Sequence, residues 1–206
     1  MKMFRKVASN IALCLLTVGL GLPAAAATVT TIVLDEKKQP IADAVITLSP
    51  GVGTKGASVA GKATIAQINK EFSPRVTVVA TGSQVWFPNR DSIRHHVYSF
   101  SPAKRFDIKL YAGDPPAPVL FDKPGLIVLG CNIHDWMIAY VYVTDAPYFG
   151  KTDALGRLSL GGLPAGDYEA HLWHPDQSGP ELVQSLRVTG ESVSFPLTIT
   201  IKATRN

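Results

Sequence analysis

The sequence predicts an all-β protein built from sandwiches. Its apolar stretches are short and rich in β-branched residues, as in residues 28–34 (TVTTIVL) and 138–143 (IAYVYV). Turn residues separate these stretches, and the 206-residue chain holds 17 Gly and 15 Pro. No segment repeats its apolar residues with the 3.6-residue period of a long helix. Short strands at this spacing are typical of β-sandwiches.

The remaining strands follow from the same alternation of apolar runs and turns. They are predicted at residues 44–48, 75–80, 84–87, 97–100, 106–111, 119–121, 126–129, 158–163, 169–173, 183–188 and 193–201. Residues 51–61, rich in Gly, Ser and Ala, are predicted to form a loop.

Residues 1–27 have the pattern of a secretory signal peptide, with a basic start, an apolar run and a small-residue end. These parts are Lys2, Arg5 and Lys6, then residues 11–22, then Pro23 and residues 24–27. The apolar run is too short to span a bilayer comfortably. We therefore expect a periplasmic or secreted protein without stable membrane insertion; retention of the segment as an anchor is the alternative.

Loss of this segment changes both the charge and the cysteine content. The formal charge falls from +4 to +1 because three basic residues and no acidic ones leave. The other basic residues are scattered and form no stripe, so we expect no nucleic-acid partner. Of the two cysteines only Cys131 remains, and one cysteine cannot form an intramolecular disulfide.

Cys131 begins the segment Cys131-Asn132-Ile133-His134-Asp135-Trp136-Met137, which has the residue types of a metal site. Its spacing lets one tight loop direct a thiolate, an imidazole and a thioether toward a common centre. The pair His95-His96 offers a further imidazole from another strand. Sulfur and imidazole donors together select copper over magnesium or calcium, without excluding zinc. Taken singly, Cys131 and Met137 are also consistent with core packing, and His134 with a surface loop.

Residues 85–100 (VWFPNRDSIRHHVYSF) and 125–143 (GLIVLGCNIHDWMIAYVYV) resemble the two copper-binding segments of cupredoxins, in particular the amicyanin and plastocyanin group. The Cys-x2-His-x2-Met spacing is that of amicyanin's ligand loop. The resemblance covers residues 65–145. It implies a Greek-key sandwich with one type 1 copper site, held by His95, Cys131, His134 and, weakly, Met137.

The function implied by this resemblance is the passage of single electrons to and from a redox protein partner. Proteins with this arrangement often carry a methylamine-utilisation label, which indicates likeness to amicyanin. In cupredoxins the loop histidine is often the exposed edge through which electrons leave. We therefore expect Trp136 to form an apolar docking surface and Asp135 to favour a basic partner. Inward packing of Trp136 is the alternative.

The sequence departs from the cupredoxin pattern beside the ligands. Cupredoxins usually carry Asn after the upstream histidine and Ser or Thr after the cysteine, whereas this chain has His96 and Asn132. We predict that these two side chains contact each other beside the metal, and that Asn89 also supports the ligands. Because side chains alternate along a strand, only one of His95 and His96 can face the metal. The resemblance favours His95.

The two ends of the chain resemble a carboxypeptidase regulatory-like sandwich. The early half is residues 33–48, with the turn Lys37-Lys38-Gln39-Pro40-Ile41, and the late half is residues 152–168. We therefore expect a split sandwich from residues 28–64 and 146–206, with the copper domain of residues 65–145 inserted between them. Such modules bind or scaffold, so we expect no chemistry there.

No enzyme is predicted. The sequence has no Gly-rich phosphate loop, no paired carboxylates and no serine in a nucleophile-elbow setting. His171 and His174 fall on opposite faces of one strand and are expected to be structural. Two other functions stay open: copper binding or delivery without electron transfer, and a metal-free binding domain.

Overall fold

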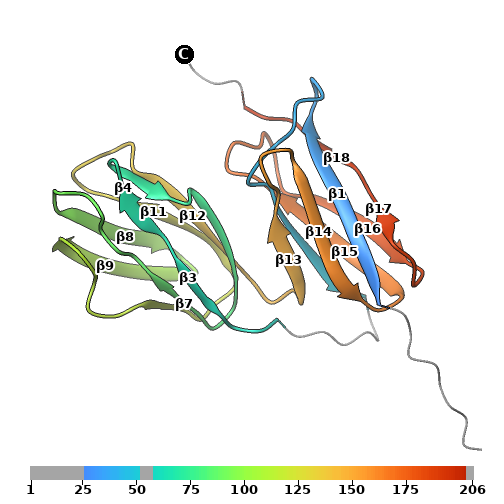
Figure 1. The fold of residues 1–206 in the computed structure, drawn as a ribbon, viewed down its shortest axis with the longest axis horizontal. Helices are drawn as coiled ribbons and strands as arrows, with labels where there is room; N and C mark the ends of the chain where they lie inside the picture. Colours follow the sequence, from blue (N-terminus) through green and yellow to red (C-terminus); the bar gives the residue numbers. More distant parts are fainter. Residues whose placement is uncertain (1–25, 52–57, 203–206) are drawn as a thin grey trace, which may run out of the picture.

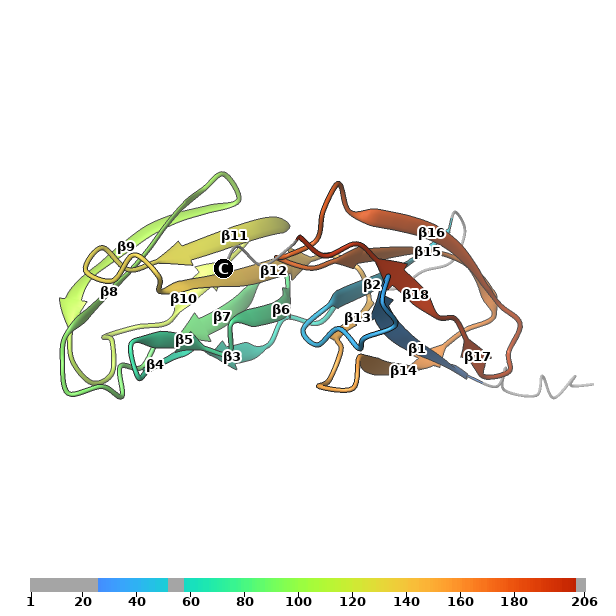
Figure 2. The same ribbon diagram turned by 90° about the horizontal axis from the view of Figure 1, so that it is seen from above.

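The computed structural model describes residues 26–51 and 58–202, which form two β-sandwiches side by side (Figures 1 and 2). Every regular element in these residues is a strand, so the all-β prediction is confirmed. No helix in the described part of the chain is long and apolar enough to cross a membrane. Most of the predicted signal peptide lies outside the described residues. Ala27, its last residue, is buried at the start of the first strand.

The first sandwich contains the predicted copper-binding segments. Its strands are β3 (Lys62–Thr64), β4 (Ala66–Ile68), β5 (Glu71–Ser73), β6 (Val76–Ala80), β7 (Ser83–Trp86), β8 (His95–Ser101), β9 (Lys104–Tyr111), β10 (Val119–Phe121), β11 (Gly125–Gly130) and β12 (Ile138–Thr144). One sheet has the order β6-β12-β11-β8-β9 and faces the three strands β10-β7-β3, with β4 and β5 paired as a hairpin. The core of this first sandwich includes Phe87, Phe121 and Leu129, which are fully buried.

The second sandwich has its own hydrophobic core and uses both ends of the chain. Its strands are β1 (Ala27–Asp35), β2 (Val45–Pro50), β13 (Tyr148–Lys151), β14 (Arg157–Leu163), β15 (Gly166–Trp173), β16 (Leu182–Val188), β17 (Val193–Ser194) and β18 (Leu197–Ile199). One sheet has the order β14-β1-β17, with β18 also on β1, and the other has the order β13-β2-β15-β16.

Long-range pairing joins the ends of the chain. β1 is antiparallel to β14, with Thr31 opposite Leu158, and β2 is antiparallel to β15, with Ile46 opposite Leu172. β1 buries alternate residues, so its apolar face needs a second sheet to cover it. The sheet β13-β2-β15-β16 covers that face, and the first sandwich is connected between β2 and β13.

Polar and aromatic contacts join the two sandwiches along β12. Arg75 donates two hydrogen bonds of 2.9 Å to the carboxylate of Asp176. The Tyr142 hydroxyl donates to Glu181 at 2.6 Å. The ring of Trp173 lies 5.8 Å from that of Tyr142 and 5.6 Å from that of Tyr140. The second sandwich therefore contacts the strand that leads away from the predicted ligand loop.

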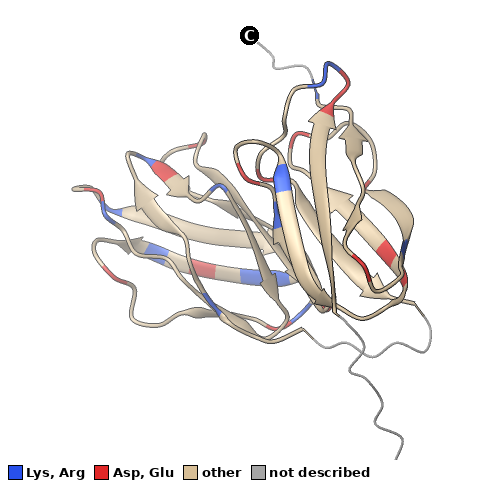
Figure 3. Cartoon of the chain, turned by 45° about the vertical axis from the view of Figure 1, so that its right-hand side comes forward, with Lys and Arg blue, Asp and Glu red and all other residues tan. Residues whose placement is uncertain are grey.

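The structure adds four short strands that the sequence pattern did not predict: β3, β4, β5 and β13. β3 pairs with β7, so the sheet of the first sandwich includes residues before the expected boundary at residue 65. The predicted strand 193–201 is divided into β17 and β18, because Pro196 has no N–H for the ladder. Basic and acidic residues are mixed over both sandwiches (Figure 3).

Gly156 lies directly before β14, where the two ends of the chain pair, and has a φ of +71°. A Cβ at this position would lie 2.5 Å from the carbonyl oxygen of Val33 on β1. We expect Gly156→Ala to cost about 2–4 kcal/mol, from left-handed strain and the clash. Gly179→Ala is the control, because its φ is +88° but no atom lies within 4 Å of the added Cβ. Urea unfolding should show the larger loss for Gly156→Ala; equal losses would contradict the prediction.

Candidate metal centre

A seven-residue loop between β11 and β12 carries the predicted ligands. Gly130 and Ile138 form the last pair of this antiparallel hairpin, so residues 131–137 form the loop. The amide of Met137 donates to the carbonyl of His134 at 3.0 Å and closes a turn inside it. Cys131 and Met137, at the two ends of the loop, are 3% and 1% exposed. His134 lies between them and is partly exposed.

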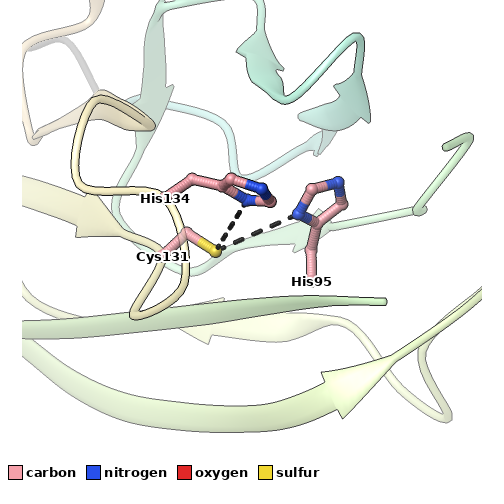
Figure 4. Close-up of side chains that lie close together, drawn as sticks. All are labelled: His95, Cys131 and His134. Atoms are coloured by element: carbon pink, nitrogen blue, oxygen red, sulfur yellow. Dashed lines mark hydrogen bonds between the residues drawn. The ribbon is translucent and has the colours of Figure 1, made fainter. Parts of the chain in front are cut away.

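His95 reaches the same point from β8, the neighbour of β11 in the sheet. Its side chain is fully buried. The Nδ1 atom of His95 is 4.0 Å from Sγ of Cys131, and Nδ1 of His134 is 3.9 Å from the same sulfur. The three donor atoms all lie within 4.8 Å of one another (Figure 4). The structure thus brings together three of the four predicted ligands as donor atoms facing one point.

These separations suit a bound transition metal. Two donors that are each about 2.0–2.3 Å from one ion lie about 3.8 Å apart when the angle at the ion is near 120°. The sulfur–nitrogen distances of 4.0 and 3.9 Å are close to this value. A thiolate with two imidazoles in trigonal arrangement, supplemented by a weak methionine, is the donor set of blue-copper sites. The residues therefore fit copper in both type and spacing.

His96 lies on the opposite face of β8 from His95. Its Nε2 atom is hydrogen-bonded to Asp107 on β9, and its ring centroid is 5.3 Å from that of Tyr98. The register of the β8–β9 pair shifts between His95 and Val97. Both His95 and His96 are buried. The geometry accordingly offers His95, and not His96, to the metal.

His96 and Asn132 were predicted to contact each other, but the described part of the chain shows no hydrogen bond between them. Asn132 is exposed on the loop, whereas His96 is bonded to Asp107. Asn89 instead supports the turn that leads into β8. Its side-chain amide donates to the carbonyls of Ile93 at 2.8 Å and Tyr111 at 2.9 Å. The polar support for the ligand strands therefore comes from Asn89 and from neighbours that the sequence pattern did not indicate.

Asp91 is the functional neighbour that the sequence pattern missed. Its Oδ2 atom is 2.7 Å from Nε2 of His95. The backbone amides of Asn69 and Lys70 donate to Oδ1 and Oδ2 at 2.6 and 2.8 Å. Partial burial favours the neutral acid, but the hydrogen bonds from Lys70, His95 and Asn69 outweigh it and lower the pKa of the Asp91 carboxyl. The signal available in the sequence was an aspartate four residues before the histidine.

Trp136 lies on the surface beside the loop histidine and is 66% exposed. Its ring centroid is 5.1 Å from that of His134, and its Nε1–H donates to the carbonyl of Lys70 at 3.1 Å. Asp135 is also exposed. One edge of the candidate centre is therefore an imidazole and an indole that solvent or a partner can reach.

A hollow on the surface borders the loop of residues 131–137. Cys131 and Met137 line it together with Tyr98 and Phe100. The Tyr98 ring packs so closely on Gly130 that a Cβ there would lie 2.8 Å from its atoms. A glycine directly before the cysteine thus allows an aromatic ring to cover this part of the backbone.

His171 and His174 form no comparable group. His171 is 2.7 Å from Glu169 and 3.2 Å from Glu181, and despite the opposing effect of burial these carboxylates raise its pKa. Burial lowers the pKa of His174. Within the described ranges, only His95, Cys131 and His134 form a set of three close metal-binding donors.

No protein-family model matches the chain, and no curated protein sequence matches it. Solved structures similar to it include the purple cupredoxin from Nitrosopumilus maritimus, at 21% identity and a TM-score of 0.36, covering 40% of this chain and 99% of that protein. A reduced Cu(I) form of an amicyanin variant is 18% identical with a TM-score of 0.37, covering 48% of this chain and 98% of amicyanin.

A copper-containing nitrite reductase from Thermus scotoductus SA-01 is 23% identical, with a TM-score of 0.39. The match covers 56% of this chain but 28% of the reductase. Because every TM-score is below 0.5, we base the metal assignment on this chain's own donors and not on the metals or activities of those proteins.

The different surroundings of His95 and His96 generate a test of the ligand set. We expect His95→Gln to weaken binding of Cu(II) or Co(II) by more than 100-fold, since it removes a donor that faces Cys131. His96→Gln is the matched control and should change affinity by less than about tenfold, at the low end of the effect of a residue outside the ligand set. Competition with a metal chelator measures both affinities. Equal losses would contradict the prediction, and a larger loss for His96→Gln would assign the ligand to His96.

Proposed function

We propose that this chain is a copper protein that passes single electrons between redox partners. One type 1 site is held by His95, Cys131, His134 and, weakly, Met137. The observation that supports this most directly is a buried cysteine sulfur with histidine Nδ1 atoms at 4.0 and 3.9 Å. No other residue type supplies a thiolate, and thiolate with imidazole favours copper.

The framework around these residues suits electron transfer. Copper, when bound, supplies the one-electron couple between its two oxidation states. Cys131 directly follows β11 and Met137 directly precedes β12, and these two strands pair with each other. His95 is the first residue of β8, which belongs to the same sheet. Ligands fixed by a sheet move little when the charge of the ion changes, which keeps the reorganisation small. The burial of His95 and Cys131 limits the access of water to the donors.

A copper-storage or delivery module is the second candidate function. The partial exposure of His134 would let a bound ion be approached from outside. Electron transfer is favoured because the buried thiolate and the strand-borne histidine oppose the ligand exchange that delivery requires. For the same reason we propose a carrier and not an enzyme.

We also propose that the protein is exported to the periplasm or secreted and that its domains are organised as an insertion. The composition of residues 1–27 supports export. The pairing of β1 with β14 and of β2 with β15 supports one split sandwich, from residues 28–64 and 146–206. Residues 65–145 carry the copper site, with β3 as an additional strand of the same sheet system.

The proposed function predicts an intense visible absorption band when Cu(II) is added to the purified protein. The band arises from charge transfer between the Cys131 thiolate and copper, and ascorbate should bleach it reversibly. Cys131→Ser should lose the band, while its far-UV circular dichroism stays that of the unchanged protein. Absorption and electron paramagnetic resonance spectra make the measurement.

Each other outcome supports another function. Copper bound without the band would favour storage or delivery, and no copper bound would favour a metal-free binding domain. A band that persists in Cys131→Ser would place the site elsewhere.

We propose that the redox partner docks over Trp136, with Asp135 favouring a basic partner surface. Trp136 is 66% exposed beside His134, as expected for an apolar anchor of a short-lived complex. Trp136→Ala should lower the second-order rate of electron transfer by about tenfold, equivalent to about 1.4 kcal/mol. Leu155→Ala is the control, because Leu155 is 56% exposed just before β14, in the second sandwich. Stopped-flow oxidation by a small basic redox protein measures the rate; equal effects of both variants would contradict docking at Trp136.

A further inference from the structure

A two-residue turn outside the ligand loop lies beside the candidate centre. Asn69 and Lys70 join β4 to β5, and both have positive φ angles of 55° and 60°. This is the backbone of a type I′ hairpin turn, which suits the twist of the two strands. Asparagine adopts it readily, whereas lysine does so rarely. Lys70 therefore holds an unfavourable conformation, and the contacts made by its backbone indicate why.

The turn directs two amides at one carboxylate. The Asn69 amide donates to Oδ1 of Asp91, and the Lys70 amide donates to Oδ2, which also lies 2.7 Å from Nε2 of His95. An ionised carboxylate only accepts hydrogen bonds. Because both oxygens of Asp91 already accept backbone N–H groups, the proton in the contact with Oδ2 is assigned to Nε2 of His95, which leaves the lone pair of the ring on Nδ1. That is the atom 4.0 Å from the sulfur of Cys131.

The same turn also holds the side chain next to the second imidazole. The carbonyl of Lys70 accepts the hydrogen bond from Nε1–H of Trp136 at 3.1 Å. The indole in turn lies against the ring of His134. One turn is therefore joined to His95 through Asp91 and to His134 through Trp136, although it contributes no ligand itself.

We propose that Asp91 and the Asn69–Lys70 turn form a clamp on the metal centre, with Asp91 as the positioning residue for His95. Asp91 sets the tautomer and orientation of His95, and the Lys70 carbonyl keeps Trp136 over His134. The negative charge beside His95 makes its Nδ1 a better donor and stabilises Cu(II) relative to Cu(I). This inference rests on the proposed function in taking His95 as a copper ligand.

Asparagine cannot replace Asp91 in this clamp. Three N–H groups converge on the two carboxylate oxygens: those of Asn69, Lys70 and His95. An asparagine side chain has one oxygen and one NH₂ group, so at least one of the three donors would face another donor. Asp91→Asn therefore changes the hydrogen bonding of the clamp with almost no change of side-chain volume.

The first experiment uses the metal-free protein. Nitrogen-15 chemical shifts and two-bond couplings of the imidazole report which ring nitrogen carries the proton. His95 should be the Nε2–H tautomer in the unchanged protein and a mixture of tautomers in Asp91→Asn. Asp153→Asn is the matched control. Asp153 also accepts two backbone amides, but both bond to its single Oδ1 atom, so an asparagine oxygen can keep them.

The second experiment measures copper. Asp91→Asn should weaken Cu(II) binding by 10–100-fold and Cu(I) binding less. Each tenfold difference between the two affinities raises the reduction potential by 59 mV, and Asp153→Asn should leave the potential unchanged. An unchanged potential in a folded Asp91→Asn protein would overturn the proposal.

The measurement on the unchanged metal-free protein keeps the proposal testable if the variant fails to fold. A proton on Nδ1 of His95 would overturn the clamp whether or not copper binds. Absence of the visible band in the unchanged protein would instead contradict the proposed function. The tautomer of His95 in the metal-free protein would still show whether Asp91 positions that ring. The two failures are therefore distinguishable.

Discussion

The register of β8, β11 and β12 is the constraint on which the candidate metal centre depends. Gly130 pairs with Ile138 on one side and with Tyr98 on the other, so the residue after Gly130 comes beside the start of β8. A shift by one residue would turn Cys131 to the opposite face of the sheet, away from His95. The sulfur–nitrogen distances of 4.0 and 3.9 Å are consequences of this pairing. The loop histidine can reach the sulfur because only two residues separate it from Cys131.

The support of the centre comes from outside the three strands. Asp91 and Asn89 belong to the loop before β8, and Asn69 and Lys70 belong to the hairpin of β4 and β5. Asp91 contacts the buried histidine directly and accepts the amides of Asn69 and Lys70, and hydrogen bonds to an ionised group are stronger than those between neutral groups. On the other side, β12 continues from the ligand loop into the contact with Trp173 of the second sandwich. The centre is thus anchored at both ends of its loop.

The fold was largely predictable, because strands of alternating apolar residues and turns rich in Gly and Pro are local patterns. The missed strands β3, β4, β5 and β13 have three or four residues each, too few for a period to be visible. The candidate site was predictable where ligand types repeat at short spacing, as in Cys131, His134 and Met137. Among the described residues His96 and Asn132 share no hydrogen bond, because His96 is bonded to Asp107 and Asn132 is exposed to solvent.

By itself the sequence determined the all-β architecture and the loop that carries a cysteine, a histidine and a methionine at short spacing, since each depends on residues close together in the chain. Only the tertiary structure decided that His95 faces Cys131 while His96 does not, that Asp91 holds His95, and that the chain ends share one sandwich. Those features depend on contacts between segments far apart in sequence. Strand register, hydrogen-bond direction and burial select such contacts, and no local pattern encodes them.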